Sequence, residues 1–172
     1  MDIQSEKFES WVRELFADKQ KKDVCYHTIE HTIFIVEKVR EIGEFYKLSD
    51  QDHEDLFFIA WLHDVGYLDG KAAGHEDRGA ELAQTWLSKL GVPQNRIEKI
   101  KKGILVTKLP QTPQDLFESI ICDADMYHLG TENFYKQTLL LKCELEKNGA
   151  GKINKIDWLR NSKEFVEKHQ YH

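Results

Sequence analysis

A histidine and a carboxylate stand side by side at the end of an apolar run. His63 and Asp64 directly follow residues 56–62, which read Leu-Phe-Phe-Ile-Ala-Trp-Leu. Such a run is expected to be buried, and a buried polar or charged group costs free energy unless it is hydrogen-bonded, ion-paired or bound to a metal. The pair therefore needs compensating partners from elsewhere in the chain.

Three further segments place residues that can bind metals beside apolar helical patterns. Each combines histidine or carboxylate side chains with neighbours that should be buried. The three segments carry His27 with His31, His75 with Glu76, and Asp123 with Asp125.

The spacing of these residues restricts which of them can meet. His27 and His31 are four residues apart, so both are predicted to lie on one face of a helix. Asp123 and Asp125 are two apart and point to different sides of a helix, so we expect only one of them to face a given site.

Taken singly, these residues have ordinary explanations, but together they favour a metal. A lone histidine on a helix is more often exposed or hydrogen-bonded, and Asp123 could bond to a neighbouring helix end. However, two apolar helices that each carry a buried carboxylate are uncommon. Two imidazoles and two carboxylates would satisfy one another through a divalent cation. We interpret the remaining histidines as ordinary ones: His53, His128, His169 and His172.

The mixed nitrogen and oxygen set bears on the kind of metal site. Imidazole suits Mn, Fe, Co, Ni and Zn, whereas carboxylate suits Mg and Mn. The set contains no thiolate, so a closed structural zinc site is disfavoured. Four protein ligands on an octahedral ion leave positions open for water and substrate, as metal-assisted catalysis requires.

The elements that must position these residues are predicted to be consecutive amphipathic helices with short connections. This pattern predicts an all-α helical bundle. The helices are expected to begin near Ser5, Thr28, Asp50, His75, Pro93, Thr112, Thr131 and Asn154.

Capping residues and apolar spacing refine these boundaries. Ser5 and Thr131 are expected as N-caps, and Thr112 as an N-cap followed by Pro113 in the first turn. Gly91 is a typical residue for ending a helix. Five apolar residues of the second helix are expected to face inward: Ile29, Ile33, Val36, Val39 and Phe45.

The overall composition limits the class of protein. The chain has 172 residues and a formal net charge of −6, which suits one domain over residues 1–172 and argues against a broad nucleic-acid-binding surface. No apolar segment is long enough to cross a membrane or to form a signal core. Isolated Cys25, Cys122 and Cys143 favour reduced thiols in a cytoplasmic protein. A Cys25 nucleophile assisted by His27 is the less favoured alternative.

Five ordered blocks of the chain carry a resemblance to a known family. The blocks are residues 26–32, 60–67, 75–80, 104–107 and 123–130. In this order they resemble the HD-domain superfamily of metal-dependent phosphohydrolases, in a small stand-alone bacterial branch, over about residues 26–134. The resemblance implies an all-α bundle of the HD type that holds a divalent metal ion.

The same resemblance implies roles for individual residues. Asp123 would orient a ligand histidine, and Glu76 is the weaker candidate for proton transfer. His27 and His75 would contact the substrate phosphate or donate a proton. The metal ligands would be His31, His63, Asp64 and Asp125.

Two positions depart from the family pattern. Residues 104–107 contain no histidine, so one metal ion is expected rather than two. Tyr67 stands where some nucleotidases of the superfamily carry an acidic residue, and nearby Asp69 is the possible substitute.

The leading hypothesis is hydrolysis of a phosphoester or phosphoanhydride by a metal-activated water. Asp64 would bridge the metal and the water. Lys108 and Arg78 are nearby cations, although exposed helix surface is the preferred interpretation of both. The expected substrate is a nucleotide or a small organic phosphate, with specificity in residues 68–74, and a homo-oligomer is possible. The alternatives are a di-iron oxygenase of the same fold and a non-catalytic metal- or nucleotide-binding domain.

Overall fold

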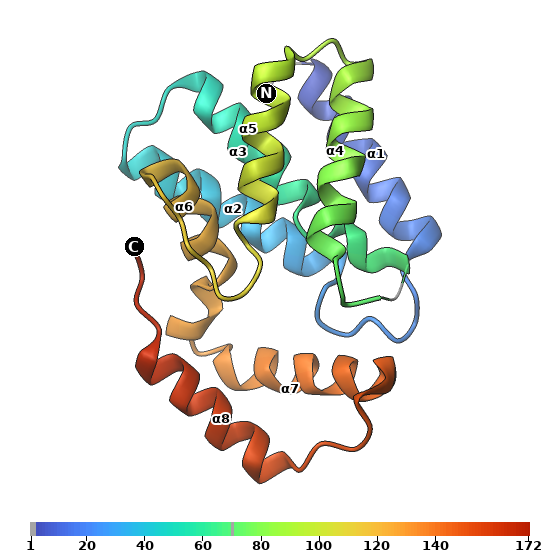
Figure 1. Cartoon of the computed structure of the whole chain (residues 1–172), viewed down its shortest axis with the longest axis vertical. Coiled ribbons are helices and arrows are strands. Elements are labelled where there is room, and N and C mark those ends of the chain that lie inside the picture. Colours follow the sequence, from blue (N-terminus) through green and yellow to red (C-terminus); the bar gives the residue numbers. More distant parts are fainter. Residues whose placement is uncertain (1–2, 70) are drawn as a thin grey trace.

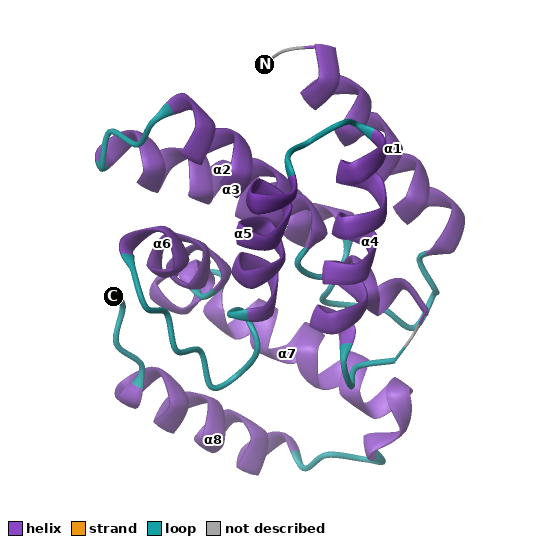
Figure 2. Cartoon of the chain, turned by 45° about the horizontal axis from the view of Figure 1, so that its top comes forward, coloured by secondary structure: helices purple, strands orange, loops and turns teal. Residues whose placement is uncertain are grey.

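The computed structural model describes residues 3–69 and 71–172, without the side chains of residues 3, 4 and 69 (Figures 1 and 2). Within this part the chain forms eight α-helices and no strand, which confirms the predicted all-α class. Short helical turns follow three of the helices: η1 (Val65–Asp69), η2 (Tyr127–Gly130) and η3 (Glu146–Ala150). The α-helices are α1 (Ile3–Lys19), α2 (Ile29–Phe45), α3 (Asp50–Leu62), α4 (His75–Lys89), α5 (Gln94–Leu105), α6 (Leu116–Asp125), α7 (Phe134–Leu145) and α8 (Lys155–Lys168).

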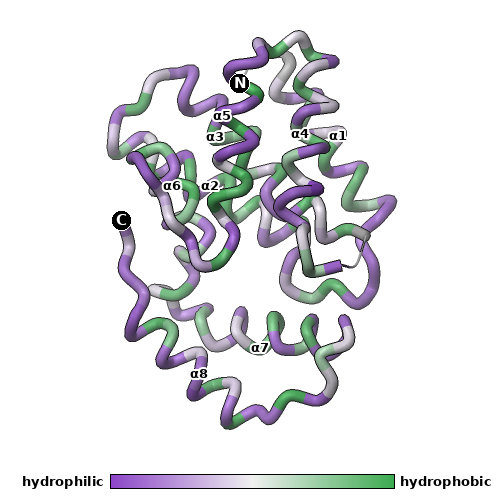
Figure 3. The backbone as a smooth tube through the Cα atoms, in the orientation of Figure 1, coloured by the Kyte–Doolittle hydropathy of each residue, from purple (hydrophilic) through white to green (hydrophobic). Residues whose placement is uncertain are grey.

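The helix α3 lies at the centre of the bundle. It packs against α1, α2, α4, α5 and α6, and every residue from Leu56 to Leu62 except Phe57 is buried. The hydrophobic parts of α3 and α5 lie together near the middle of the bundle (Figure 3). The helices α7 and α8 lie across one end of it (Figures 1 and 2). The apolar run before His63 is therefore core, as predicted.

Several predicted helix boundaries are confirmed by the capping contacts. Thr28 caps α2, and its side chain accepts a hydrogen bond from the backbone N–H of His31. Asn154 caps α8 in the same way. Gly91 follows the end of α4 with a φ of +75°, a conformation that favours glycine.

Other boundary predictions are wrong. The helix α6 begins at Leu116 rather than after Thr112, because Asp115 caps it and accepts from the N–H of Glu118. Glu118 in turn accepts from the N–H of Gln114, a reciprocal arrangement that fixes the helix start. Thr131 does not cap α7, which begins at Phe134 after Asn133.

Two further expectations at the ends of helices are also wrong. Ser5 lies inside the first turn of α1, because that helix begins at Ile3. Phe45 is 78% exposed, because it ends α2 beyond the region where that helix packs.

Two glycines allow α4 to approach the end of α3 closely. A β-carbon at Gly79 would lie 2.7 Å from the backbone oxygen of Leu62, and one at Gly66 would lie 2.0 Å from that of His75. Real β-carbons do not approach backbone oxygens this closely, so any side chain would push these segments apart. The contact brings His75 to the end of α3, next to Asp64.

A buried ion pair joins α3 to α5. Arg96 donates two hydrogen bonds to Oδ1 of Asp55, at 2.8 and 2.5 Å, and one to Glu54 Oε2 at 2.5 Å. Asp55 is fully buried, whereas the Glu54 side chain is 29% exposed.

Among the described residues, no helix combines the length and the apolar character that crossing a bilayer requires.

We expect Asp55→Ala to destabilise the fold far more than Glu54→Ala. Removing one partner of a buried pair leaves uncompensated charge and costs about 3 kcal/mol, whereas a partly exposed pair contributes less than about 1 kcal/mol. Urea unfolding followed by circular dichroism measures both variants. Equal losses of unfolding free energy would contradict the assigned importance of the Asp55 contact.

Candidate metal centre

Four of the sequence-predicted residues converge from three helices. His31 lies in the first turn of α2, and His63 and Asp64 directly follow α3. Asp125 is the last residue of α6. The structure thus brings together all four residues that were predicted as metal ligands.

The ligand atoms of these residues lie close together. The Nε2 atom of His31 is 3.3 Å from Asp64 Oδ2 and 3.7 Å from Asp125 Oδ1. The Nε2 atom of His63 is 3.0 Å and 3.8 Å from the same two atoms. His31, His63 and Asp64 are buried, and the Asp125 side chain is 13% exposed.

The buried atoms of this cluster fit a divalent cation. The Nε2 atoms of His31 and His63 and Oδ2 of Asp64 have no hydrogen-bond partner. The other ring nitrogen of His63, Nδ1, is 2.8 Å from the carbonyl oxygen of Ala60, so it donates there and leaves the Nε2 lone pair for a metal. Two imidazole nitrogens and two carboxylates form a donor set that suits Mn, Fe, Co, Ni or Zn.

The electrostatics of the cluster also favour bound positive charge. Burial lowers the pKa of His31, but Asp125 and Asp64 outweigh this and raise it to about 9. Burial raises the pKa of Asp64, yet His63 and His27 hold it well below its usual range. The buried carboxylates therefore require compensating positive charge from protons or a metal ion.

The structure distinguishes Asp125 from Asp123. Besides its position near both histidines, Asp125 accepts a hydrogen bond from Gln111 Nε2 at 3.1 Å. Asp123 accepts from the backbone N–H of His172 at 3.1 and 3.2 Å. Asp123 thus contacts His172 and not a ligand histidine, contrary to the expectation from the resemblance.

His75 lies beside the cluster and contacts Asp64. Its Nε2 atom is 3.3 Å from Asp64 Oδ1, and its Nδ1 donates to the carbonyl oxygen of Ala72 at 2.8 Å. Burial lowers the pKa of His75, but the contact with Asp64 raises it by more. Buried Glu76 has Oε2 3.5 Å from His75 Nδ1. Asp64 therefore connects His75 with the two cluster histidines.

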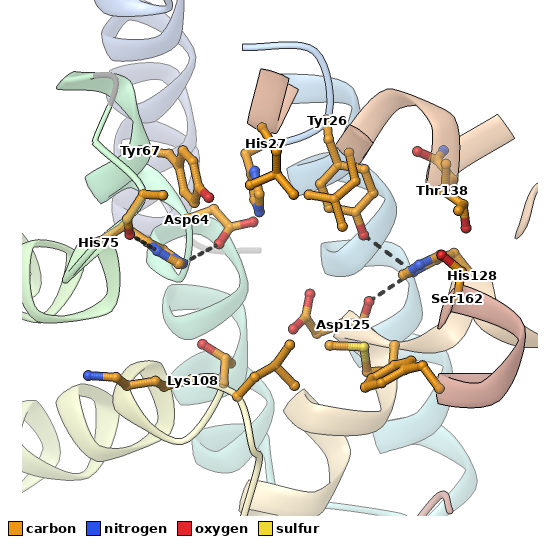
Figure 4. Close-up of a pocket in the computed structure, with 18 of the residues that line it drawn as sticks. Tyr26, His27, Asp64, Tyr67, His75, Lys108, Asp125, His128, Thr138 and Ser162 are labelled. Atoms are coloured by element: carbon orange, nitrogen blue, oxygen red, sulfur yellow. Dashed lines mark hydrogen bonds and ion pairs between the residues drawn. The ribbon is translucent and has the colours of Figure 1, made fainter. Parts of the chain in front are cut away.

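His27 reaches the same region from a loop. The prediction that His27 and His31 share one helical face is wrong, because Thr28 is the N-cap and has an extended backbone. The ring of His27 stacks on Tyr67, with ring centroids 3.8 Å apart and planes 12° apart. Figure 4 shows both rings above Asp64.

Glu144 of α7 holds this loop, a role that was not predicted from the sequence. Its Oε1 pairs with His27 Nδ1, and its Oε2 accepts from the backbone N–H groups of Cys25, Tyr26 and His27 at 2.8–3.1 Å. Glu144 is fully buried. Burial raises the pKa of its carboxyl group, but His27 lowers it by more. The sequence pattern that could have indicated a buried Glu144 is its position among the leucines at 139–141 and 145.

The two predicted cations differ in their surroundings. Arg78 donates to the carbonyl oxygens of Gly66 and Ala73, at 3.0 and 2.8 Å, and to that of Lys71. It therefore ties together the loop before α4. Lys108 lines the cavity described below. The side chain of Asp69 lies outside the described residues.

The cysteines do not form a Cys–His pair. All three are free, and the Sγ atoms of Cys25 and Cys143 lie 3.3 Å apart. The thiol of Cys25 also donates to the carbonyl oxygen of Asp23 at 3.6 Å. Since the sulfur of Cys25 contacts Cys143 and the carbonyl oxygen of Asp23 rather than the His27 ring, a nucleophile built from Cys25 and His27 has no support.

A cavity of about 560 Å³ opens onto the cluster. Asp64, Asp125, His27 and His75 line one part of it. Figure 4 shows Thr138 and Ser162 on the side away from His75. The cavity is large enough for a small organic molecule.

Comparison with known proteins identifies the helical core. The HD domain family model matches residues 28–130, which is more than half of the chain. The chain belongs to the HD-domain family. Domains of this family generally bind divalent metals, in agreement with the donor set above. The match ends at residue 130, so α7 and α8 of this chain lie outside it.

A solved structure shows the same fold. The crystal structure of a predicted HD superfamily hydrolase from an uncultured Thermotogales bacterium matches with a TM-score of 0.58 and 23% sequence identity. The match covers 91% of this chain and 83% of that chain. A search of curated proteins finds no significant match.

We expect Mn²⁺ to stabilise this HD domain through Asp125. A metal at 100 times its Kd stabilises the folded state by about 2.7 kcal/mol, which raises Tm by about 5–10 °C for a chain of this size. Asp125→Asn should lose most of this shift, and Asp123→Asn should retain it. Calorimetry with and without Mn²⁺ measures all three proteins. An unchanged shift in Asp125→Asn would contradict the assigned ligand.

We expect Glu144→Ala to loosen the loop that carries His27. Loss of the buried acceptor should speed hydrogen exchange of the amides of residues 25–27 by about tenfold or more. Mass spectrometry of deuterium uptake measures this locally. Glu146→Ala is the control, because Glu146 accepts from Lys142 and Ile153 instead. Exchange that is equal in both variants would show that Glu144 does not hold the loop.

Proposed function

We propose that this protein is a metal-dependent phosphohydrolase that cleaves a phosphoester or phosphoanhydride bond in a small phosphorylated substrate, either a nucleotide or an organic phosphate. The observation that most supports this is the set of buried ligand atoms on His31, His63 and Asp64, which face one another and make no hydrogen bond. Asp64 and Asp125 also line the cavity, so a substrate can reach the cluster. Family membership provides independent support.

The proposed metal ligands are His31, His63, Asp64 and Asp125. A divalent cation bound there would polarise a phosphoryl oxygen and lower the pKa of a bound water. We assign one ion to this set, because among the described residues one group of three or more metal-type side chains, His31, His63 and Asp125, has its ligand atoms within 4.8 Å of one another. A di-iron oxygenase would need a second set of ligands.

Asp64 and His75 form the proposed proton-transfer pair. One carboxylate oxygen of Asp64 faces the cluster histidines, and the other is 3.3 Å from Nε2 of His75. Because Nδ1 of His75 donates to a carbonyl oxygen, Nε2 is the nitrogen that can exchange a proton. We assign His75 as the general acid: the carbonyl oxygen of Ala72 orients the ring through Nδ1, and the proton on Nε2, which lies against Asp64 before substrate binds, would pass to the leaving oxygen.

His27 and Lys108 are the proposed phosphate contacts. Nδ1 of His27 is engaged by Glu144, so Nε2 is free to contact a phosphate oxygen. The contacts of Glu144 with the ring and with the backbone of residues 25–27 hold the ring in position, and a preorganised donor favours stabilisation of developing charge. Lys108 also lines the cavity, and because its amino group points away from Asp64 and Asp125 in Figure 4, its side chain would have to turn to reach a phosphate.

We expect Asp64→Ala to abolish metal-dependent hydrolysis while the helices still form. The loss in kcat/KM should be about a thousandfold or more, because both the metal and His75 lose a partner. Phosphate release from a panel of nucleotides and organic phosphates with Mn²⁺, Mg²⁺, Co²⁺, Ni²⁺ and Zn²⁺ measures this.

Asp123→Ala is the matched control and should keep its activity within about twofold, because Asp123 is half-buried against His172 and contacts neither the cluster nor His75. Activity of Asp64→Ala near that of the wild type would contradict the mechanism. Inactivity of the wild type with every metal, together with tight nucleotide binding, would favour the non-catalytic alternative.

A further inference from the structure

The part of the cavity that is lined by α7 and α8 has an apolar, aromatic lining. Trp158 and Phe165 of α8 contribute to it, with Phe134, Leu141 and Leu145 of α7. All five residues lie outside the residues 28–130 that match the HD domain. This lining is therefore a feature that the family match does not account for.

The polar groups of this region are mostly engaged or uncharged. The indole N–H of Trp158 donates to the carbonyl oxygen of Thr138 at 2.8 Å, so the ring has no donor left for a ligand. The hydroxyl of Ser162 donates to the carbonyl oxygen of Trp158 at 2.8 Å. Gln137 and Asn161, which also line the cavity, are neutral. A ligand group in this region gains most from being uncharged and apolar.

The charge of the lining disfavours a polyphosphate. Among the described residues that line the cavity, Lys108 is the one lysine or arginine, against Asp64, Glu76 and Asp125. The Arg78 guanidinium does not line the cavity and holds backbone carbonyl groups instead. Groups of several phosphates are usually bound by several cationic side chains or by a phosphate-binding loop. The cavity provides cationic contacts for about one phosphate group.

We propose that the substrate is a monophosphate ester whose leaving group carries a flat, uncharged ring, and that the ring binds against Trp158 and Phe165 of α8. This inference rests on the proposed phosphohydrolase function and deepens it. The phosphate lies at the end lined by Asp64 and His75, and the ring fills the apolar part. Aromatic side chains stack on flat rings with little dependence on which ring it is. The helix α8 therefore determines specificity, and the residues from the HD core perform the chemistry.

Matched substrate pairs test the ring and the charge separately. The full chain with Mn²⁺ is assayed with adenosine 5′-monophosphate against ribose 5-phosphate, which differ by the base but share the leaving oxygen. Benzyl phosphate against ethyl phosphate tests a ring outside nucleosides, and adenosine 5′-diphosphate tests added charge. Each ring-bearing ester should show about tenfold higher kcat/KM than its partner, and the diphosphate should be poorer than the monophosphate.

Variants of α8 connect that preference to the proposed lining. In Trp158→Ala the ratio of kcat/KM between adenosine 5′-monophosphate and ribose 5-phosphate should fall about tenfold, chiefly through KM. Phe165→Ala is a second variant, since Phe165 is 40% exposed and its removal threatens folding less. Ile156→Ala is the control on the same helix: Ile156 is 69% exposed and lies outside the lining.

The outcomes separate this inference from the function on which it rests. Turnover without a ring preference, a preference for the diphosphate, or a ratio unchanged in both α8 variants would overturn the ring proposal and leave the phosphohydrolase intact. No turnover of any phosphate with any of the metals would overturn the proposed function, and the ring proposal with it.

Discussion

The carboxylate of Asp64 is buried at the end of the central helix, and this is the constraint on which the site depends. An apolar helix end offers no water to a charged group, so compensation must come from other side chains or a cation. His31 and His63 approach one carboxylate oxygen and His75 the other. Gly66 and Gly79 permit the close helix contact that brings His75 there. Satisfying one buried carboxylate thus links α2, α3 and α4.

The residues proposed to carry out catalysis and those proposed to select the substrate lie on different segments of the chain. The cluster and His75 lie within residues 28–130, the part that matches the HD domain. The helices α7 and α8 lie beyond it, yet α7 holds His27 through Glu144 and both helices line the cavity. A change in α8 can therefore alter which ligand fits without moving the cluster, whereas a change at Glu144 reaches the site through the loop at residues 25–27.

The parts that the sequence predicted well depend on local patterns. Thr28 and Gly91 mark helix ends through bonds within a few residues, and the apolar run before His63 had one sensible location, the core. The meeting of His31, His63 and Asp125 was predicted from the resemblance of the blocks to a known family, because spacing alone does not predict how α2, α3 and α6 pack.

The failures have equally physical causes. Asp115 is a better cap than Thr112 because Glu118 completes the reciprocal bonds, a choice that composition alone does not decide. The role of Glu144 depends on contacts with a loop about 117 residues away in the chain, and no local pattern reports such a contact. The same holds for Asp55 and Arg96, and for the α7–α8 lining of the cavity.

Anomalous diffraction from crystals of the full chain grown with Mn²⁺ would test the central claim most directly. We expect one strong peak at the cluster, within about 2.0–2.3 Å of His31 Nε2, His63 Nε2 and one oxygen each of Asp64 and Asp125. No peak there at saturating Mn²⁺, or a peak that leaves the buried histidine nitrogens without a ligand, would contradict it.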